Sequence, residues 1–233
     1  MPSDAHHFSH CMISVNRLRN RKSDFAVHNW ILDSGAFTEL FRFGHYRHSV
    51  QEYADCIKRW RTCGNLQAAV SQDWMVEPFI REKTGLTVKD HQRLTIERYD
   101  ELLACDTGVY ILPVLQGYRP EEYVSHIRQY GDMLRAGAWV GVGSVCSVGS
   151  VCKRNSKPEQ VEALLKAIYR ERPDLRIHGF GLKITALGNR VVRDLLWSAG
   201  SMAWSFAARW QGRNPNDWKE AKGFVERVEN QIS

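Results

Sequence analysis

Strand-like and helix-like segments alternate along nearly the whole chain, and this alternation constrains the fold more than any other feature. Short apolar runs predict strands, and longer segments with regularly spaced apolar residues predict helices. Strands are predicted over residues 11–15, 30–33, 66–71, 109–115, 139–143, 176–182 and 201–205. Helices are predicted over residues 50–62, 89–104, 120–136, 157–170, 189–198 and 216–231. Repeated strand–helix–strand units imply a parallel sheet with crossover helices.

These units suit a closed (β/α) barrel of the TIM type, regular or irregular, and a doubly wound open sheet is the alternative. The chain has 233 residues, a length typical of one α/β domain. Hydrophobic residues make up 43% of it, which is enough to form a sizeable core. No linker-like segment divides the sequence, so we expect a single domain over residues 1–233.

The charge of the chain favours a polyanionic partner such as nucleic acid. It holds 32 Lys and Arg against 26 Asp and Glu, a net charge of +6. No apolar run approaches the roughly 18 residues that a membrane helix needs. The N-terminal residues contain no apolar signal segment. We therefore expect a cytoplasmic protein with no membrane partner.

Six cysteines are scattered through the sequence, at positions 11, 56, 63, 105, 146 and 152. Such scattering in a long chain is typical of reduced thiols rather than of a disulfide framework. No C-x-x-C pair occurs, which disfavours a structural zinc site, and we expect neither a metal nor a cofactor. The last two cysteines belong to a tandem repeat, residues 142–146 and 148–152, which we interpret as a tolerated loop insertion.

The run Trp30-Ile31-Leu32 leads directly into Asp33 and Ser34, followed by Gly35. An apolar strand that ends in an acid, a hydroxyl and a glycine places reactive groups at its C-terminal end. In parallel α/β proteins that end is where chemistry is carried out. The competing interpretation is that Asp33 only caps the following turn.

Three further predicted strands also end in polar or glycine-rich residues. Asp73, with Trp74 beside it, follows the third strand, and a carboxylate next to an aromatic ring suits a purine-like base. The fourth strand ends in an amide that can read a base edge, and glycines in the fifth give a flat ligand access to the backbone. The residues predicted to bind a base at these ends are Asp73, Gln116, Gly117, Gly141 and Gly143. Together, the strand ends predict one pocket.

The sixth and seventh predicted strands add a histidine, cations and aromatic rings. His178 is a further base-contact candidate, although a histidine in a strand is more often a satisfied core residue. Mixtures of cations and aromatic rings line nucleic-acid grooves, and single cations suit phosphates. The residues predicted to contact nucleic acid are Arg17, Arg19, Lys183, Trp204, Arg209 and Arg213. Solvated arginines and core tryptophans are the competing interpretation.

These strand ends, in this order, resemble the tRNA-guanine transglycosylase superfamily, and most closely its DNA-acting, DpdA-like branch. Residues 33–37 are similar to the family's Asp-Ser-Gly-Gly/Ala-Phe motif, so the resemblance implies that Asp33 is catalytic. It implies that Asp73 recognises the base and that Gln116-Gly117 contacts it. Gly141 and Gly143 resemble the family's glycine-rich base-contact strand. The resemblance covers residues 11–213.

Two departures from the family pattern bear on the substrate and the reaction. The cysteine cluster that binds zinc in the tRNA enzymes is absent from this sequence, which favours DNA over tRNA as the substrate. The family's nucleophilic aspartate is expected at the seventh strand, where this chain has Gly200-Ser201. Asp194 lies six residues earlier, on a predicted helix, and is a poor replacement.

We therefore expect a DNA glycosylase-type enzyme that hydrolyses the N-glycosidic bond of a modified base. Asp33 would orient water or stabilise the positive charge on the sugar, with Ser34 and Asp73 beside it. The target base would leave the helix stack at a cost of roughly a few kcal/mol. One alternative is a 7-deazaguanine DNA transglycosylase that takes up a free deazapurine base and uses Asp33 or Asp73 as nucleophile. The other is a non-catalytic module that binds DNA or a modified base.

Overall fold

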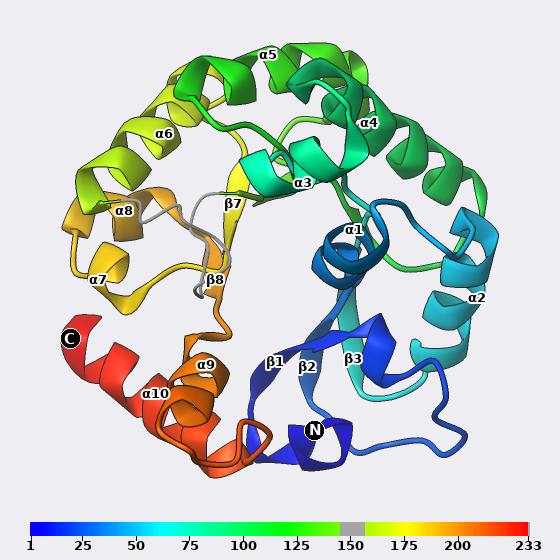
Figure 1. Ribbon diagram of the computed structural model, residues 1–233, viewed down its shortest axis with the longest axis vertical. Helices are drawn as coiled ribbons and strands as arrows, with labels where there is room; N and C mark the ends of the chain where they lie inside the picture. The colour runs from blue at the N-terminus through cyan, green and yellow to red at the C-terminus, as the bar shows by residue number, and fades with distance from the viewer. Residues whose placement is uncertain (145–156, 233) are drawn as a thin grey trace. The chain divides into compact units, whose positions relative to one another are not determined.

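The computed structural model describes residues 1–144 and 157–232. Most of the tandem repeat, with Cys146 and Cys152, lies outside these ranges. The chain forms two compact units, Met1–Val114 and Leu115–Ser233. Figure 1 shows the helices and strands coloured from the N-terminus to the C-terminus. Each unit contains parallel strands and helices, which confirms a mixed α/β protein. The closed barrel and the single domain stay predictions.

The first unit is built on the sheet β1–β2–β3–β4, in which neighbouring strands are parallel. Its strands are β1 (His10–Ser14), β2 (Asn29–Asp33), β3 (Asn65–Val70) and β4 (Ile111–Leu112). Its helices are η1 (Pro2–His7), η2 (Val15–Arg17), α1 (Ala36–Phe43), α2 (Val50–Trp60), α3 (Pro78–Thr84) and α4 (Val88–Ala104). The register pairs Ser14 with Asp33 and Leu32 with Ala69, so the C-terminal ends of β1, β2 and β3 lie at the same edge.

Local sequence explains where the helices of the first unit begin and end. Helix α2 starts at a capping box between Ser49 and Glu52, and α4 starts at one between Thr87 and Asp90. Helix α1 lies between two glycines with left-handed backbone angles, Gly35 at φ 76° and Gly44 at φ 74°. Helix α1 was not predicted, because its 8 residues form only about two turns, too few to show a helical period in the sequence.

The second unit contains the sheet β5–β6–β7–β8. Its strands are β5 (Val114–Leu115), β6 (Trp139–Val142), β7 (Arg176–Phe180) and β8 (Ser198–Gly200). Its helices are α5 (Pro120–Tyr130), η3 (Gly131–Met133), α6 (Pro158–Glu171), α7 (Ile184–Leu187), α8 (Arg190–Leu195), α9 (Ala203–Trp210) and α10 (Trp218–Ile232). Pro120 and Pro158 stand at the first positions of α5 and α6, where the missing N–H costs nothing.

Two predicted strands differ from the structure. The strand predicted over residues 109–115 is interrupted at Pro113, which has no N–H to donate and separates β4 from β5. The strand predicted over residues 201–205 is wrong. Strand β8 ends at Gly200, and the alanine-rich segment after it forms α9, in agreement with the helix propensity of alanine.

Apolar residues from the strands and from the helices that pack on them form the core of each unit. In the first unit, Trp30 and Leu32 of β2 are buried, as are Tyr53 and Ile57 of α2. In the second, the buried residues include Val140, Ile177, Leu164 and Ile168. Among the described helices, none is long and apolar enough to cross a membrane.

Candidate functional site

Asp33 is the last residue of β2 and faces Ser14, its register partner on β1. The backbone N–H of Gly35 donates to Asp33 Oδ2 at 3.2 Å. Removal from water raises the pKa of Asp33, and hydrogen bonds from Ser14 and Gly35 oppose that rise. The Asp33 carboxylate thus accepts a hydrogen bond in the turn that leads into α1. It also protonates more readily than a carboxylate in water.

The turn after Asp33 is tightly packed. Gly35 has φ 76°, and a Cβ built on it would lie 2.5 Å from Asn16 Nδ2. Only glycine fits this backbone conformation in this space. Ser34 is fully buried and lies beside the phenol of Tyr46. The glycine of the motif therefore provides space for Asn16.

Asp73 belongs to the segment that follows β3 and is 7% exposed. The hydroxyl of Tyr46 donates to the backbone carbonyl of Asp73 at 2.7 Å. Gln72 accepts a hydrogen bond from Arg98 Nη1 at 2.8 Å, and the N–H of Trp74 donates to Thr95 Oγ1 at 2.8 Å. Residues Gln72, Asp73 and Trp74 are therefore each held by a hydrogen bond, from Arg98, from Tyr46 and to Thr95 respectively.

The charges of Asp33 and Asp73 act on the same buried groups. Burial raises the pKa of Tyr46 well above its usual value, and the charge of Asp73 raises it further, with a smaller effect from Asp33. Burial likewise raises the pKa of Tyr53 well above its usual value, and the charges of Asp33 and Asp73 again contribute. The structure therefore brings the predicted catalytic residues of this unit, Asp33, Ser34 and Asp73, into one cluster.

An aromatic side chain next to this cluster was missing from the predicted site. Phe37, in the first turn of α1, is 41% exposed and stacks on Phe41 with ring centroids 5.4 Å apart and planes at 9°. Exposed rings of this kind are suitable stacking surfaces for bases. The position of Phe37, four residues after Asp33 in the same motif, was the feature of the sequence that could have identified it as a site residue.

The arginines of the basic segment after β1 differ in their exposure to solvent. Arg17 is exposed at the end of η2. Arg19 is half-buried, its Nε donates to Asn16 Oδ1 at 3.3 Å, and its charge acts on Tyr53. Contact of Arg17 and Arg19 with DNA stays a prediction.

In the second unit, Gln116 and Gly143 fit against each other. Gln116 is fully buried, its N–H donates to His126 Nδ1, and its Oε1 accepts from Ser144 Oγ, both at 2.8 Å. A Cβ built on Gly143 would lie 2.3 Å from Gln116 Nε2. The space that glycine leaves at position 143 is therefore occupied by the protein's own amide. His126 was not predicted from the sequence.

Gly117 shows the same close packing. A Cβ built on it would lie 2.7 Å from the ring of Tyr123. The hydroxyl of that tyrosine donates to the backbone carbonyl of Gly143 at 2.7 Å. Tyr123 thereby links the segment after β5 to the end of β6. Gln116 and Gly117, predicted at the end of one strand, and Gly143, predicted at the end of the next, form one interlocked group.

His178 lies on β7 and is the register partner of Gly141 on β6. It is 2% exposed, and its Nδ1 lies 2.8 Å from Ser198 Oγ. Burial lowers the pKa of His178 to about 4, so the ring is neutral at neutral pH. These features favour a core histidine over a proton donor.

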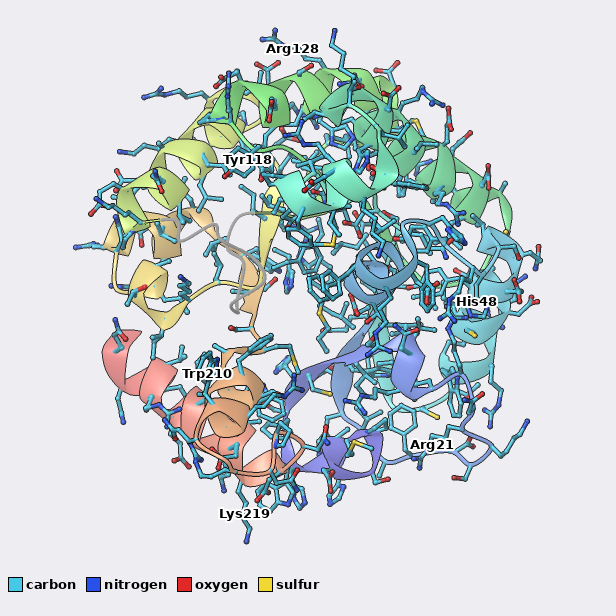
Figure 2. The ribbon with its side chains drawn as sticks, in the orientation of Figure 1. Arg21, His48, Tyr118, Arg128, Trp210 and Lys219 are labelled. Atoms are coloured by element: carbon cyan, nitrogen blue, oxygen red, sulfur yellow. The ribbon has the colours of Figure 1, made fainter. Side chains whose placement is uncertain are left out.

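The predicted DNA contacts of the second unit lie before α7, on α9 and just after α9. Lys183 is half-buried before α7, and Trp204, which was predicted to lie in a strand, lies on α9 together with Arg209. Arg213 forms an ion pair with Glu220, which compensates its charge. Trp210 at the end of α9 is 76% exposed (Figure 2).

Within residues 1–144 and 157–232, no group of three or more His, Cys, Asp or Glu is arranged to hold a metal ion. The structure brings Asp33, Ser34 and Asp73 together in the first unit, and Gln116, Gly117 and Gly143 together in the second. A single pocket that contains both groups stays a prediction.

A family model described as "DpdA: DeoxyPurine in DNA protein A" matches residues 6–221 of the chain. No curated protein matches it.

Proposed function

Because the chain belongs to the DpdA family, deoxypurine in DNA protein A, we propose that it cleaves the N-glycosidic bond of a modified base in DNA. Membership indicates an enzyme that acts on bases of DNA. The observation that carries the finer proposal is Asp33, a largely desolvated carboxylate at the C-terminal end of β2. Asp73 lies in the same cluster of the first unit.

The proposed reaction is hydrolysis. Cleavage of the bond between the base and C1′ leaves positive charge on the sugar, which the ionised carboxylate of Asp33 stabilises. A water oxygen bonds to C1′ and keeps one proton as the hydroxyl of the abasic site. The base departs with the bonding electrons and takes up one proton, which balances the proton that the water loses. The products are a free base and an abasic site. Desolvation strengthens the attraction between Asp33 and the sugar cation.

The end of β8 supports hydrolysis over base exchange. Gly200 is the last residue of this strand and pairs with Phe180 of β7. It has no carboxylate, whereas the resemblance to the transglycosylases calls for one there. Exchange needs a nucleophile that holds the sugar until a second base arrives, while hydrolysis requires only that water be admitted.

In the second unit, we propose that Gln116 contacts the base. Its side-chain amide contains a donor and an acceptor, and Ser144 Oγ donates to the amide oxygen and so orients the amide. The backbone N–H of Gln116 donates to His126 Nδ1 and holds the main chain at this position. Lys183 and Arg209 are proposed to contact phosphates.

The second candidate is base exchange by a 7-deazaguanine DNA transglycosylase. Asp73 favours it, because this second carboxylate shares a cluster with Asp33 and either could attack the sugar. A non-catalytic binding module is the third possibility, and it predicts that Asp33→Ala leaves all function intact.

The deciding experiment incubates the purified protein with DNA that contains 7-deazapurine or ordinary bases, with and without labelled free 7-deazaguanine. Mass spectrometry then measures free base, abasic sites and incorporated label, with Asp33→Ala as the matched variant. Free base with abasic sites, lost in the variant, supports the glycosylase. Incorporated label supports exchange, and unchanged DNA in every reaction rejects both activities.

A further inference from the structure

Two buried tyrosines connect the strand ends that carry Asp33 and Asp73. Tyr53, on α2, is fully buried, and its hydroxyl donates to the carbonyl of Val70 at 2.8 Å. The same oxygen lies 3.4 Å from the carbonyl oxygen of Leu32. Leu32 immediately precedes Asp33, and Val70 is the last residue of β3. One phenol is thus in contact with the backbone of β2 and of β3 just before their functional ends.

Tyr46 makes the second connection, from the segment between α1 and α2 to the carbonyl of Asp73. The next residue, Arg47, is fixed by the fully buried Glu39 of α1. Arg47 Nε and Nη2 donate to the two carboxylate oxygens of Glu39 at 3.1 and 2.8 Å, and its backbone N–H donates at 3.1 Å. Because α1 begins immediately after Gly35, one helix connects the Asp33 turn to the residue that holds Asp73.

Helix α4 supports the same arrangement from the other side. The guanidinium of Arg98 lies over the ring of Tyr46, 4.5 Å from its centroid, while its Nη1 donates to Gln72. Thr95 accepts the N–H of Trp74. Tyr46 is therefore restrained by Arg98 and by the Glu39–Arg47 pair, and the residues on both sides of Asp73 are restrained by α4.

The chemistry of the phenols suits permanent hydrogen-bond donors. Burial and the nearby negative charges raise the pKa of both Tyr46 and Tyr53 well above the usual value. Both hydroxyls therefore stay protonated across the pH range in which Asp33 ionises, and the connection does not change with pH.

We propose that Tyr46 and Tyr53 are positioning residues that fix the separation and orientation of the Asp33 and Asp73 carboxylates. This inference rests on the proposed function, because it assigns the pair to the reacting sugar and base. The spacing of two carboxylates decides whether a water or a covalent bond fits at the anomeric carbon. A loss of positioning of about 1 Å lowers the rate by about a hundredfold in enzymes that depend on geometry.

The test compares Tyr46→Phe and Tyr53→Phe with Tyr99→Phe, which removes a hydroxyl from the third buried tyrosine of the first unit, on α4. We expect kcat for base release to fall at least tenfold in the first two variants. KM should stay within threefold, and Tyr99→Phe should retain kcat within twofold. The three variants should lose similar amounts of thermal stability, so a kcat effect confined to two of them is not a general folding effect.

A second readout does not depend on activity. Carboxyl 13C NMR titration of Asp33 and Asp73 should show a lower Asp33 pKa in Tyr46→Phe and Tyr53→Phe, because a loosened cluster admits water, and no change in Tyr99→Phe. If the wild-type protein releases no base, the proposed function fails and the titration alone decides the positioning role. Unchanged titration overturns the proposal. The proposal is also overturned if the wild-type protein is active and kcat falls by the same factor in all three variants.

Discussion

Gly143→Ala tests the close packing of Gly143 against Gln116, and its cost follows from the geometry. A Cβ at position 143 would lie 2.3 Å from Gln116 Nε2, 2.9 Å from its Cδ and 3.2 Å from its Oε1. Ordinary contacts need a separation more than about 1 Å greater, so the amide must move. Because Gln116 is fully buried and its Oε1 accepts from Ser144, that movement breaks a buried hydrogen bond.

We expect Gly143→Ala to reduce the free energy of unfolding by about 2–4 kcal/mol. An unsatisfied buried polar pair costs about 1–3 kcal/mol, and overpacking of a dense site costs a similar amount. Urea unfolding followed by tryptophan fluorescence measures the change.

Gly223→Ala is the matched control, because the nearest atom to its added Cβ is Arg227 Nη1 at 3.7 Å and the residue lies in α10. It should stabilise the protein by about 0.5–1 kcal/mol through helix propensity. A Gly143→Ala protein as stable as the wild type would refute the interlocked arrangement.

Three further predictions concern charged residues. Asp33→Asn should abolish base release, and it should stabilise the protein at pH 7. A carboxyl whose pKa is higher in the folded state destabilises once ionised, so this gain should vanish below the pKa of the unfolded chain in urea melts at several pH values. Asp174→Asn should lower the free energy of unfolding by up to about 1 kcal/mol at pH 7. Hydrogen bonds from Arg172 lower the pKa of Asp174, so the stability is present at neutral pH and should be lost as the pH falls. Arg209→Ala should weaken DNA binding and reduce the slope of log K against log salt by about 1, measured by fluorescence anisotropy; an unchanged slope would remove Arg209 from the DNA contacts.

Local patterns in the sequence were sufficient for the strands that have clear apolar runs. Residues 30–33 were recognised as a strand because they begin with a short apolar run, and β2 ends there. Residues 176–182 were also predicted as a strand, and β7 lies within them. The position of Asp33 at a strand end followed from the same pattern. Where local patterns were weak, as at residues 201–205, the prediction was wrong.

The sequence by itself determined the alternating α/β character of the chain, the place of Asp33 at the end of a strand and the resemblance that led to its family. Only the tertiary structure decided which groups hold that carboxylate and its neighbours. The contact of Tyr46 with Asp73 spans 27 residues and that of Ser144 with Gln116 spans 28. Strand and helix periods report only on neighbours along the chain, whereas contacts of this kind exist only after whole elements have packed together.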